Sequence, residues 1–396
     1  MDVNKSVRQL ALPLLPALSA NASCQAFLLV VLPSLGRDLG FTPLETGLLL
    51  GSAALLLIIF APMWGGISEK TGRKRVILIS LAAAALASAL MAAVITLRLN
   101  GILERVPTLM LLFIVRACQS ILAAGLLPAA QAWIADHTTP ENRAEGMGLL
   151  GASYGVGGII GAGVAFAVGG SHPIGALGGL TVFILLGFYL VYAAVFDRPE
   201  IASLDASRLA RIDIRPFMSN LAITFIGVAI YAIMQHVTAL RLEDAMKLPR
   251  AEAISQAGAA LMGAAITMVL AQTLGVATLR YPPRQLILAG TSIGTLSLIA
   301  VTFAASPTVL LVALFLMGGA LGILLPGNLA LISIKAGMAA QGRAAGINAV
   351  AQGLAMAAGP VAGAALHRLS PQAPGYLSAI AMFVALIICL NIKGKS

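Results

Sequence analysis

Long apolar stretches follow one another along most of this 396-residue chain, with short polar connections between them. A helix needs about 20 apolar residues to cross the hydrocarbon core of a bilayer. Charged residues make up 10% of the sequence, against about 25% in soluble domains, and mean hydropathy is +0.96. The sequence therefore predicts an all-helical integral membrane protein.

Hydropathy windows of about 19 residues predict twelve transmembrane helices in two sets of six. The longest clearly polar stretch, residues 197–215, divides an N-terminal bundle at 1–196 from a C-terminal bundle at 216–396. We expect this stretch to be a cytoplasmic linker. The predicted spans are 9–33, 47–66, 76–97, 108–135, 146–168, 176–196, 217–240, 251–274, 285–304, 308–333, 344–366 and 375–392.

Short motifs recur between the two sets of spans. The sequence Leu126–Pro128 recurs as Leu324–Pro326, and the R-A-x-G motif that begins at Arg143 recurs at Arg343. The offset is close to half the chain in both cases. Parallel repeats with a site between them at the midplane are typical of secondary transporters. The repeat therefore predicts two pseudo-symmetric six-helix bundles.

The net charge of +10 is explained by membrane orientation. If both termini are cytoplasmic, seventeen Lys and Arg residues fall in cytoplasmic segments and seven in the outer loops. Cytoplasmic loops of membrane proteins carry such an excess. We therefore expect both termini in the cytoplasm. Because the basic residues are scattered over short loops, we expect no nucleic-acid partner.

The connection between the second and third predicted spans is a compact basic turn, residues 65–75, which reads G-G-I-S-E-K-T-G-R-K-R. Its spacing resembles the signature loop of the major facilitator superfamily. Glu69 stands where that family usually has Asp, and Lys70 where it has Arg. The resemblance implies the major facilitator fold and transport by alternating access.

The same resemblance implies a latch at the cytoplasmic side. In the family, an acid at the inner end of the fourth helix pairs with the basic loop, and Asp136 occupies that place. Individual surface ion pairs are weak, so such a latch would act as a network. The predicted latch residues are Gly65, Glu69, Gly72, Arg73, Asp136 and Arg143.

Arg116 is the only charged residue in the interior of a predicted span. A charge at membrane depth is costly and indicates a functional site by default. Arg116 and Gln119 resemble the R-x-x-Q-G motif of exporters in the superfamily, with Ser120 in place of the Gly. The resemblance implies that Arg116 faces the central cavity and takes part in proton or substrate coupling. The alternative is a structural arginine that donates to neighbouring carbonyl groups.

Polar residues at helical spacing form a stripe on the seventh span, and a polar pair lies on the first span. In the superfamily these helices line the cavity, so we expect the side chains to face water or cargo. The alternative is hydrogen bonding between helices, which holds a membrane bundle together. The candidate residues are Asn220, Thr224, Tyr231, Gln235 and His236 on the seventh span, and Asn21 and Gln25 on the first.

Glycines crowd the fifth span and resemble the glycine-rich motif of antiporters, which usually ends G-P-x-x-G-G. Gly158 stands in place of the Pro, and the eleventh span keeps the Gly-Pro pair. Small residues let helices approach closely and move against one another, although plain packing produces the same pattern. The residues concerned are Gly155, Gly157, Gly158, Gly161, Gly359 and Pro360.

All fifteen acidic residues lie outside the interiors of the predicted spans. Many drug:proton antiporters of the superfamily carry a membrane-embedded acid, which attracts cationic drugs and binds the proton. With Arg116 as the only fixed charge there, the sequence favours a neutral or anionic cargo. Proton coupling must then use other groups.

We expect a secondary active transporter of the bacterial inner membrane, and we favour a monomeric exporter of drugs or of siderophore-like metabolites. No nucleotide-binding or catalytic motif and no metal-ligand cluster is found, so we expect no enzymatic activity, no cofactor and no metal, with the proton gradient as driving force. One alternative is an uptake symporter of the same superfamily. Another is a membrane-embedded lipid-modifying enzyme, for which His236 is the available catalytic group.

Overall fold

The computed structural model describes residues 11–138, 140–196, 214–275, 281–336 and 341–391. Within these residues, twelve helices are long and apolar enough to cross a membrane, which confirms the predicted fold class. The first six spans are α2 (Leu14–Asp38), α3 (Pro43–Thr71), α4 (Arg73–Leu99), α5 with α6 (Arg105–Ala123, Leu126–His137), α7 (Pro140–Val164) with the π-turn η1 (Ala165–Gly169), and α8 (Pro173–Ala194).

The other six spans follow a 3₁₀ turn, η2 (Arg215–Phe217). They are α9 (Met218–Asp244), α10 (Arg250–Leu270) with the π-turn η3 (Ala271–Gly275), α12 (Pro283–Phe303), α13 (Pro307–Ala336), α14 (Gln341–His367) and α15 (Ala373–Asn391). The expected linker at 197–215 lies almost entirely outside the described residues.

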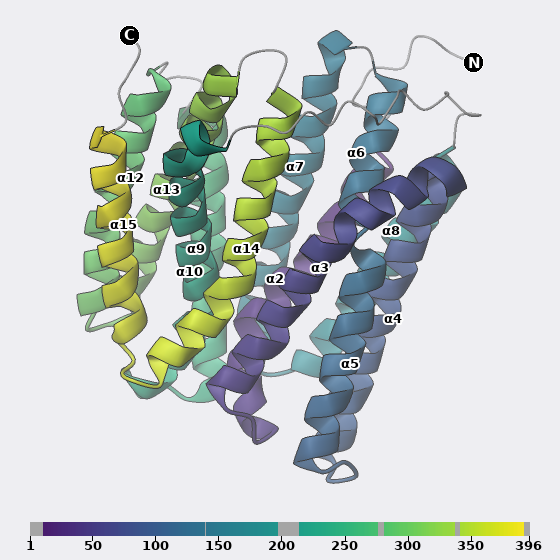
Figure 1. The fold of residues 1–396 in the computed structure, drawn as a ribbon. Helices are drawn as coiled ribbons and strands as arrows, with labels where there is room; N and C mark the ends of the chain where they lie inside the picture. Colours follow the sequence, from purple (N-terminus) through teal and green to yellow (C-terminus); the bar gives the residue numbers. More distant parts are fainter. Residues whose placement is uncertain (1–10, 139, 197–213, 276–280, 337–340, 392–396) are drawn as a thin grey trace.

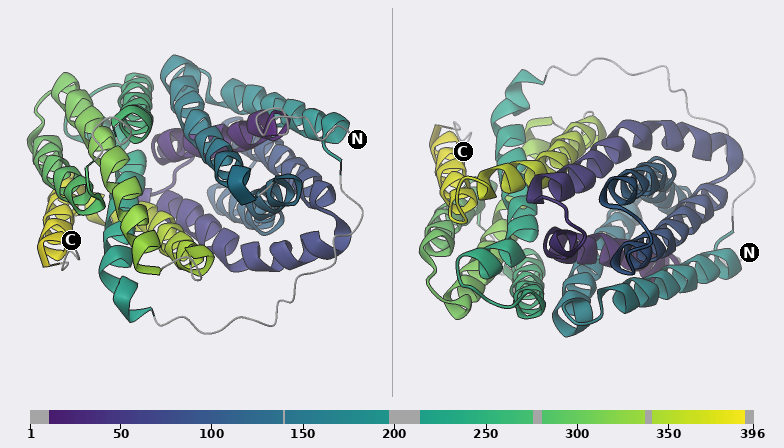
Figure 2. Two further views of the ribbon diagram at one scale, coloured as in Figure 1. Left: turned by 90° about the horizontal axis from the view of Figure 1, so that it is seen from above. Right: turned by 90° about the horizontal axis from the view of Figure 1, so that it is seen from below.

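The spans form two bundles that stand side by side, α2–α8 and α9–α15 (Figure 2). In the first bundle α2 packs against α7 and α8, and in the second α12 packs against α13 and α15. Four pairs of helices join the bundles: α3 with α14, α7 with α10, α2 with α9, and α2 with α10. α2 begins and α15 ends at one end of the molecule, which we call the terminal end (Figure 1). The other end is called the opposite end.

The outer faces of the helices carry large apolar side chains. Leu296 on α12 and Phe303 at its end are each 68% exposed, and Val182 on α8 is 66% exposed. In water this surface would be unfavourable by about 25 cal/mol per Å² of apolar area, whereas lipid tails solvate it. The exposed apolar faces therefore agree with a multi-pass membrane protein.

The predicted fourth span, 108–135, is two helices and not one. α5 ends at Ala123 and α6 begins at Leu126, and Pro128 lies in the first turn of α6. Proline has no N–H to donate and its ring collides with the carbonyl four residues earlier, which is that of Ala124. The break between α5 and α6 is the result.

Several helices extend further than their apolar windows, and the extensions of α2 and α9 matter for the contacts between the bundles. α2 continues through Pro33 to Asp38, and α9 continues to Asp244, whereas the predicted spans end at 33 and 240. A hydropathy window stops where charged residues begin, but helical hydrogen bonds continue for another turn. Proline is tolerated inside membrane helices because neighbours satisfy the freed backbone groups. The extension places charged residues on ordered helix ends.

The two bundles approach each other closely near the opposite end. A methyl group on Gly47 of α3 would lie 2.7 Å from the carbonyl oxygen of Pro360 on α14, and one on Gly51 would lie 2.5 Å from that of Ala357. Toward the terminal end of α3, a methyl group on Gly66 would meet no other atom within 4 Å. Glycine is therefore required where α3 crosses α14 and not at its terminal end.

Candidate functional site

Arg116 lies in the middle of α5 and is 4% exposed. Its Nη1 donates to Oε1 of Gln119 at 2.6 Å, and its Nη2 donates to Oε1 of Gln25 on α2 at 3.0 Å. The R-x-x-Q spacing places Gln119 one helical turn after Arg116, so the two side chains share a face. The structure thus brings together three of the predicted site residues from two helices.

The polar cluster around Arg116 is incompletely paired. Nε of Arg116, Nε2 of Gln119 and Oδ1 of Asn21, which lies one turn from Gln25 on α2, have no hydrogen-bond partner among the described residues. Buried polar groups are almost always paired with protein, water or ligand. Two of the three free atoms are donors, so the cluster can bind a ligand that carries acceptor oxygens.

The predicted stripe on α9 is divided between two environments. Asn220 donates to Oδ1 of Asn328 on α13 at 2.7 Å, and Thr224 donates to Oδ1 of Asn348 on α14 at 2.6 Å. Nδ2 of Asn328 donates in turn to Oγ1 of Thr224 at 2.9 Å. These buried bonds hold α9, α13 and α14 together, as the packing alternative predicts. A contact between these residues and cargo stays a prediction.

The part of the stripe nearer the opposite end has fewer partners. Oε1 of Gln235 and both ring nitrogens of His236 have no hydrogen-bond partner among the described residues, and His236 is fully buried. Tyr231 is half-buried and packs against the apolar core. The free Gln235 oxygen is consistent with a polar ligand, and its role in cargo binding stays a prediction.

The predicted latch residues lie at the terminal end of the first bundle. Nε of Arg73, the first residue of α4, lies 3.3 Å from Oδ2 of Asp136 on α6, and Glu69 is 4.0 Å from Arg73. Nη1 of Arg73 also donates to Ser68 at 2.6 Å. Gly72 connects α3 to α4 with φ of +97°, a conformation that glycine adopts readily.

The other latch residues are less informative. A methyl group on Gly65 would meet no other atom within 4 Å. The side chain of Arg143 lies outside the described residues. The ion pair between Arg73 and Asp136 joins two helices of the same bundle, and its action as a gate stays a prediction.

The glycines of α7 and α14 pack against other helices at several points. A methyl group on Gly157 would lie 2.5 Å from the carbonyl oxygen of Ser19, and one on Gly161 would collide with that of Ser23, so α7 lies directly on α2. A methyl group on Gly359 of α14 would lie 2.5 Å from Ala232, and the next residue, Pro360, faces Gly47. On α7, Gly155 faces Val269 of α10, and Gly158 has open space around it.

A group of charged residues that the sequence analysis did not single out joins the bundles at the opposite end. Nη1 and Nη2 of Arg37, in the last turn of α2, donate to the two carboxylate oxygens of Asp244 at 2.8 and 2.6 Å. Nη1 also donates to Glu243 at 2.9 Å. Ser34 on α2 donates to the same Glu243 carboxylate. Two acids at the end of α9 are thus held by the end of α2.

Further contacts extend this group to α10 and α14. Arg250, the first residue of α10, pairs with Asp38 at the end of α2 and lies 3.7 Å from Glu243. Nε2 of His367, the last residue of α14, is 2.7 Å from Oδ2 of Asp244. We call this group the cross-bundle cluster; its members are Arg37, Asp38, Glu243, Asp244, Arg250 and His367.

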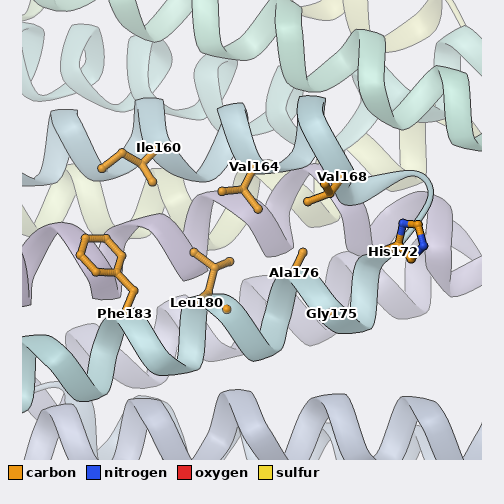
Figure 3. A pocket seen from close by; sticks show the side chains of 9 residues that line it. Ile160, Val164, Val168, His172, Gly175, Ala176, Leu180 and Phe183 are labelled. Carbon is orange, nitrogen blue, oxygen red and sulfur yellow. The ribbon is translucent and has the colours of Figure 1, made fainter.

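A pocket of about 440 Å³ lies between α7 and α8 within the first bundle (Figure 3). Apolar side chains such as Ile160, Leu180 and Phe183 line it, with His172 at one end. None of its lining residues is a predicted site residue. The pocket is therefore separate from the Arg116 cluster.

Twelve membrane helices in two bundles, with a buried arginine cluster and ion pairs that link the bundles, define a membrane transporter of the two-bundle class. The sequence profile of the Major Facilitator Superfamily matches residues 14–271 and 214–393. The chain belongs to this superfamily.

The chain is similar to known members of the superfamily. It is 28% identical over 381 residues to the class D tetracycline resistance protein of Salmonella ordonez, covering 92% of each chain. A more local match to the class G protein of Vibrio anguillarum is 32% identical over 195 residues and spans 48% of this chain and 45% of that protein.

Its fold also matches a crystal structure of a bacterial homologue of the human lysosomal transporter Spinster, captured in an inward-facing and unoccupied conformation. The TM-score is 0.71 at 16% identity, with 98% of this chain and 96% of that chain covered.

Proposed function

We propose that the chain is a proton-driven exporter of the bacterial inner membrane, with both termini in the cytoplasm. The observation that carries this proposal is the Arg116 cluster, which has free buried donors and no carboxylate partner. Export is supported by the similarity to proteins that confer tetracycline resistance. The excess of basic residues in the predicted cytoplasmic segments supports the orientation. In this orientation the opposite end is the outer end.

The contacts between the bundles support an inward-facing state in the structure. At the outer end Arg37 binds acids of the other bundle, and Gly47 and Gly51 lie against α14. Near the terminal end, Gly66 of α3 meets no neighbouring atom. Closure at one end only is what alternating access requires of each state. Export then needs an outward-open state in which the outer contacts separate.

The chemistry of the Arg116 cluster favours an anionic cargo or a neutral one rich in acceptor oxygens. Arginine presents a planar fork of donors that matches a carboxylate. Nη1 and Nη2 of Arg116 donate to Gln119 and Gln25, and its Nε has no hydrogen-bond partner among the described residues. A carboxylate or enolate oxygen would both satisfy the free donors and balance the buried charge.

Transport by the whole chain accounts for the two bundles better than catalysis does. The lipid-modifying alternative needs a catalytic group, and His236 is fully buried without a neighbouring hydrogen-bonded acid to activate it. The uptake alternative shares the fold and site, so the direction of transport must be measured. We propose a monomer that needs no cofactor and no nucleic-acid partner.

Proteoliposomes with an imposed pH gradient test the proposal. The cargo panel contains matched lipophilic anions, neutral compounds and cations, and tetracycline. We expect the protein to move anionic or neutral compounds against the proton flow. Arg116→Lys keeps the charge but loses the planar fork, so transport of anions should fall by at least about tenfold, the loss of one good charge-assisted interaction.

Arg241→Lys is a matched control. Arg241 is also buried, and its Nη2 donates to the carbonyl oxygens of Thr302 at 2.8 Å and Ala304 at 3.4 Å, which is a structural role. This variant should lower thermal stability and leave cargo preference unchanged. Selective transport of cations, or wild-type transport of anions by Arg116→Ala, would contradict the cargo assignment. Movement of cargo with the protons would contradict export.

A further inference from the structure

We propose that the cross-bundle cluster is a proton-dependent gate, and that proton uptake there opens the outer end. The cluster joins three carboxylates, two arginines and a histidine at the only place where the described residues show ion pairs between the two bundles.

The acids of the cluster are arranged so that protonation weakens closure. Arg37 belongs to the first bundle, whereas Glu243 and Asp244 belong to the second. Their attraction exists only while the outer end is closed. A proton on either carboxylate removes the negative charge that Arg37 binds, and therefore favours separation. By linkage, an outer end that opens takes up protons, and one that closes releases them.

His367 is the other group of the cluster that can bind a proton, and it acts in the same direction. It is 6% exposed, its Nε2 contacts Asp244, and its Nδ1 has no partner among the described residues. The contact with Asp244 lies within the second bundle and persists when the outer end opens. When the outer end opens, His367 instead loses its interaction with Arg37, the cation that binds the same Asp244 carboxylate. Protonated His367 repels Arg37, so its protonation also favours the open state.

Other charged and titratable groups around His367 leave this sign unchanged. Arg241 and His236 on α9 interact with it electrostatically, and both belong to the second bundle. Tyr376 on α15, near Arg241, belongs to the same bundle. Their interactions with His367 therefore do not change when the bundles separate. From the first bundle, Arg37 interacts with His367, whereas Asp38 is paired with Arg250.

The geometry suits a proton-dependent gate better than a permanent structural tie. A permanent tie needs no histidine, and an arginine in its place would bind Asp244 at every pH. The side chain of Glu243 is 8% exposed and that of Asp244 is 35% exposed, so external water reaches the cluster through Asp244. Protons from outside can then enter without crossing the apolar part of the membrane.

Distance measurements between spin labels at the outer end test the inference without any cargo. Ile102, between α4 and α5, and Leu369, between α14 and α15, are 67% and 79% exposed and lie on different bundles. Each is replaced by Cys in a chain whose own cysteines are changed to Ala: Cys24, Cys118 and Cys389. The labelled protein is placed in lipid nanodiscs, and double electron–electron resonance is recorded from about pH 8 to about pH 5.5, a range that includes the ordinary pKa of histidine.

We expect the population with the longer distance between the two labels, which is the outward-open state, to grow as the pH falls. If the open and closed states differ tenfold in proton affinity, the ratio of open to closed protein should rise about tenfold. His367→Gln keeps an amide donor near Asp244 but cannot be protonated. This variant should lose most of the pH dependence in the neutral range. A variant with Glu243→Gln and Asp244→Asn imitates the protonated acids and should be open throughout.

Glu45→Gln is the matched control. Glu45 pairs with Arg105 at 2.5 Å at the same end of the molecule, but within the first bundle, so this variant should titrate like the wild type. Outer distances of the wild type that do not change with pH, or that lengthen as the pH rises, would overturn the inference. So would full pH dependence in both cluster variants. The inference draws on the proposed export cycle only for its physiological meaning, so a failed transport assay and a failed distance measurement are separate outcomes.

Discussion

Arg37 and Asp244 form a two-pronged ion pair between the ends of α2 and α9, with the two nitrogens of the guanidinium 2.8 and 2.6 Å from the two carboxylate oxygens. The residues are 207 positions apart in the sequence and belong to different bundles. Paired parallel donors of this kind are among the stronger hydrogen-bonded contacts in proteins. In the proposed transport cycle, the pair stabilises the state that is closed at the opposite end.

Removal of this pair should shift the molecule toward the outward-open state. Hydrogen bonds to charged groups contribute about 1.5–3 kcal/mol, so Arg37→Ala or Asp244→Ala should raise the outward-open ratio by about tenfold or more. Because the two residues act on each other, the double variant should shift the ratio by less than the two single variants combined. Reaction of an outer-end cysteine with a membrane-impermeant reagent measures the shift. Fully additive effects would show that the two side chains are not coupled.

Close packing of α3 on α14 should be needed for outer closure. A methyl group at Gly51 would lie 2.5 Å from the carbonyl oxygen of Ala357, which is shorter than van der Waals contact. Overpacking of this kind costs about 1–3 kcal/mol, so Gly51→Ala should lower the melting temperature in detergent and increase reaction at the outer end. Gly66→Ala on the same helix is the control, with no atom within 4 Å. Equal effects of both changes would count against a specific contact.

The asparagine network of the second bundle should act mainly on stability. Asn328 accepts a bond from Asn220 and donates to the Asn220 carbonyl oxygen and to Thr224. Hydrogen bonds between membrane helices average about 0.6 kcal/mol, so Asn328→Ala should cost about 2 kcal/mol and lower the melting temperature. Cargo affinity of the folded fraction should stay the same. A change in cargo preference at unchanged stability would instead place Asn220 and Thr224 in the cargo site.

The latch at the terminal end should have a smaller effect. Asp136 pairs with Arg73 at 3.3 Å, and the Asp136 side chain is 36% exposed. The pair lies within the first bundle, so a shift toward the inward-open state with Asp136→Asn requires that Asp136 also contacts the second bundle in the outward-open state. Exposed ion pairs contribute about 0–1 kcal/mol, so we expect this shift in the inward-open ratio to be less than about fivefold. Accessibility of a cysteine at the terminal end reports this ratio. Glu252→Gln is the control, since Glu252 accepts from Gln256 in an exposed hydrogen bond within α10. Unchanged accessibility with Asp136→Asn would count against the latch.

The fold could be predicted from the sequence because each span is a local property. Twenty apolar residues in a row determine a membrane helix without reference to the rest of the chain. The break after Ala123 required attention to Pro128, and the last turns of α2 and α9 lie beyond the apolar windows. Local hydropathy carries no information on either feature.

The candidate site was predictable in part. Arg116 and Gln119 lie at one-turn spacing on a single helix, and their contact follows from the sequence. The pairing of Arg37 with Asp244 depends on how the two bundles dock, which no short motif encodes. The sequence indicated only that seven Lys and Arg residues fall in the predicted outer loops. The first and seventh spans occupy equivalent places in the two halves. A comparison of the charged residues at their ends could have found the pair.

Proton movement caused by cargo is the most direct test of the central claim. Proteoliposomes that contain the wild-type protein and a trapped pH-sensitive dye are prepared without a pH gradient, and an anionic or neutral cargo is added on one side. The account predicts that protons move in the direction opposite to the cargo, and that Arg116→Ala abolishes this movement. Proton movement in the same direction as the cargo, or cargo movement without protons, would contradict a proton-driven exporter.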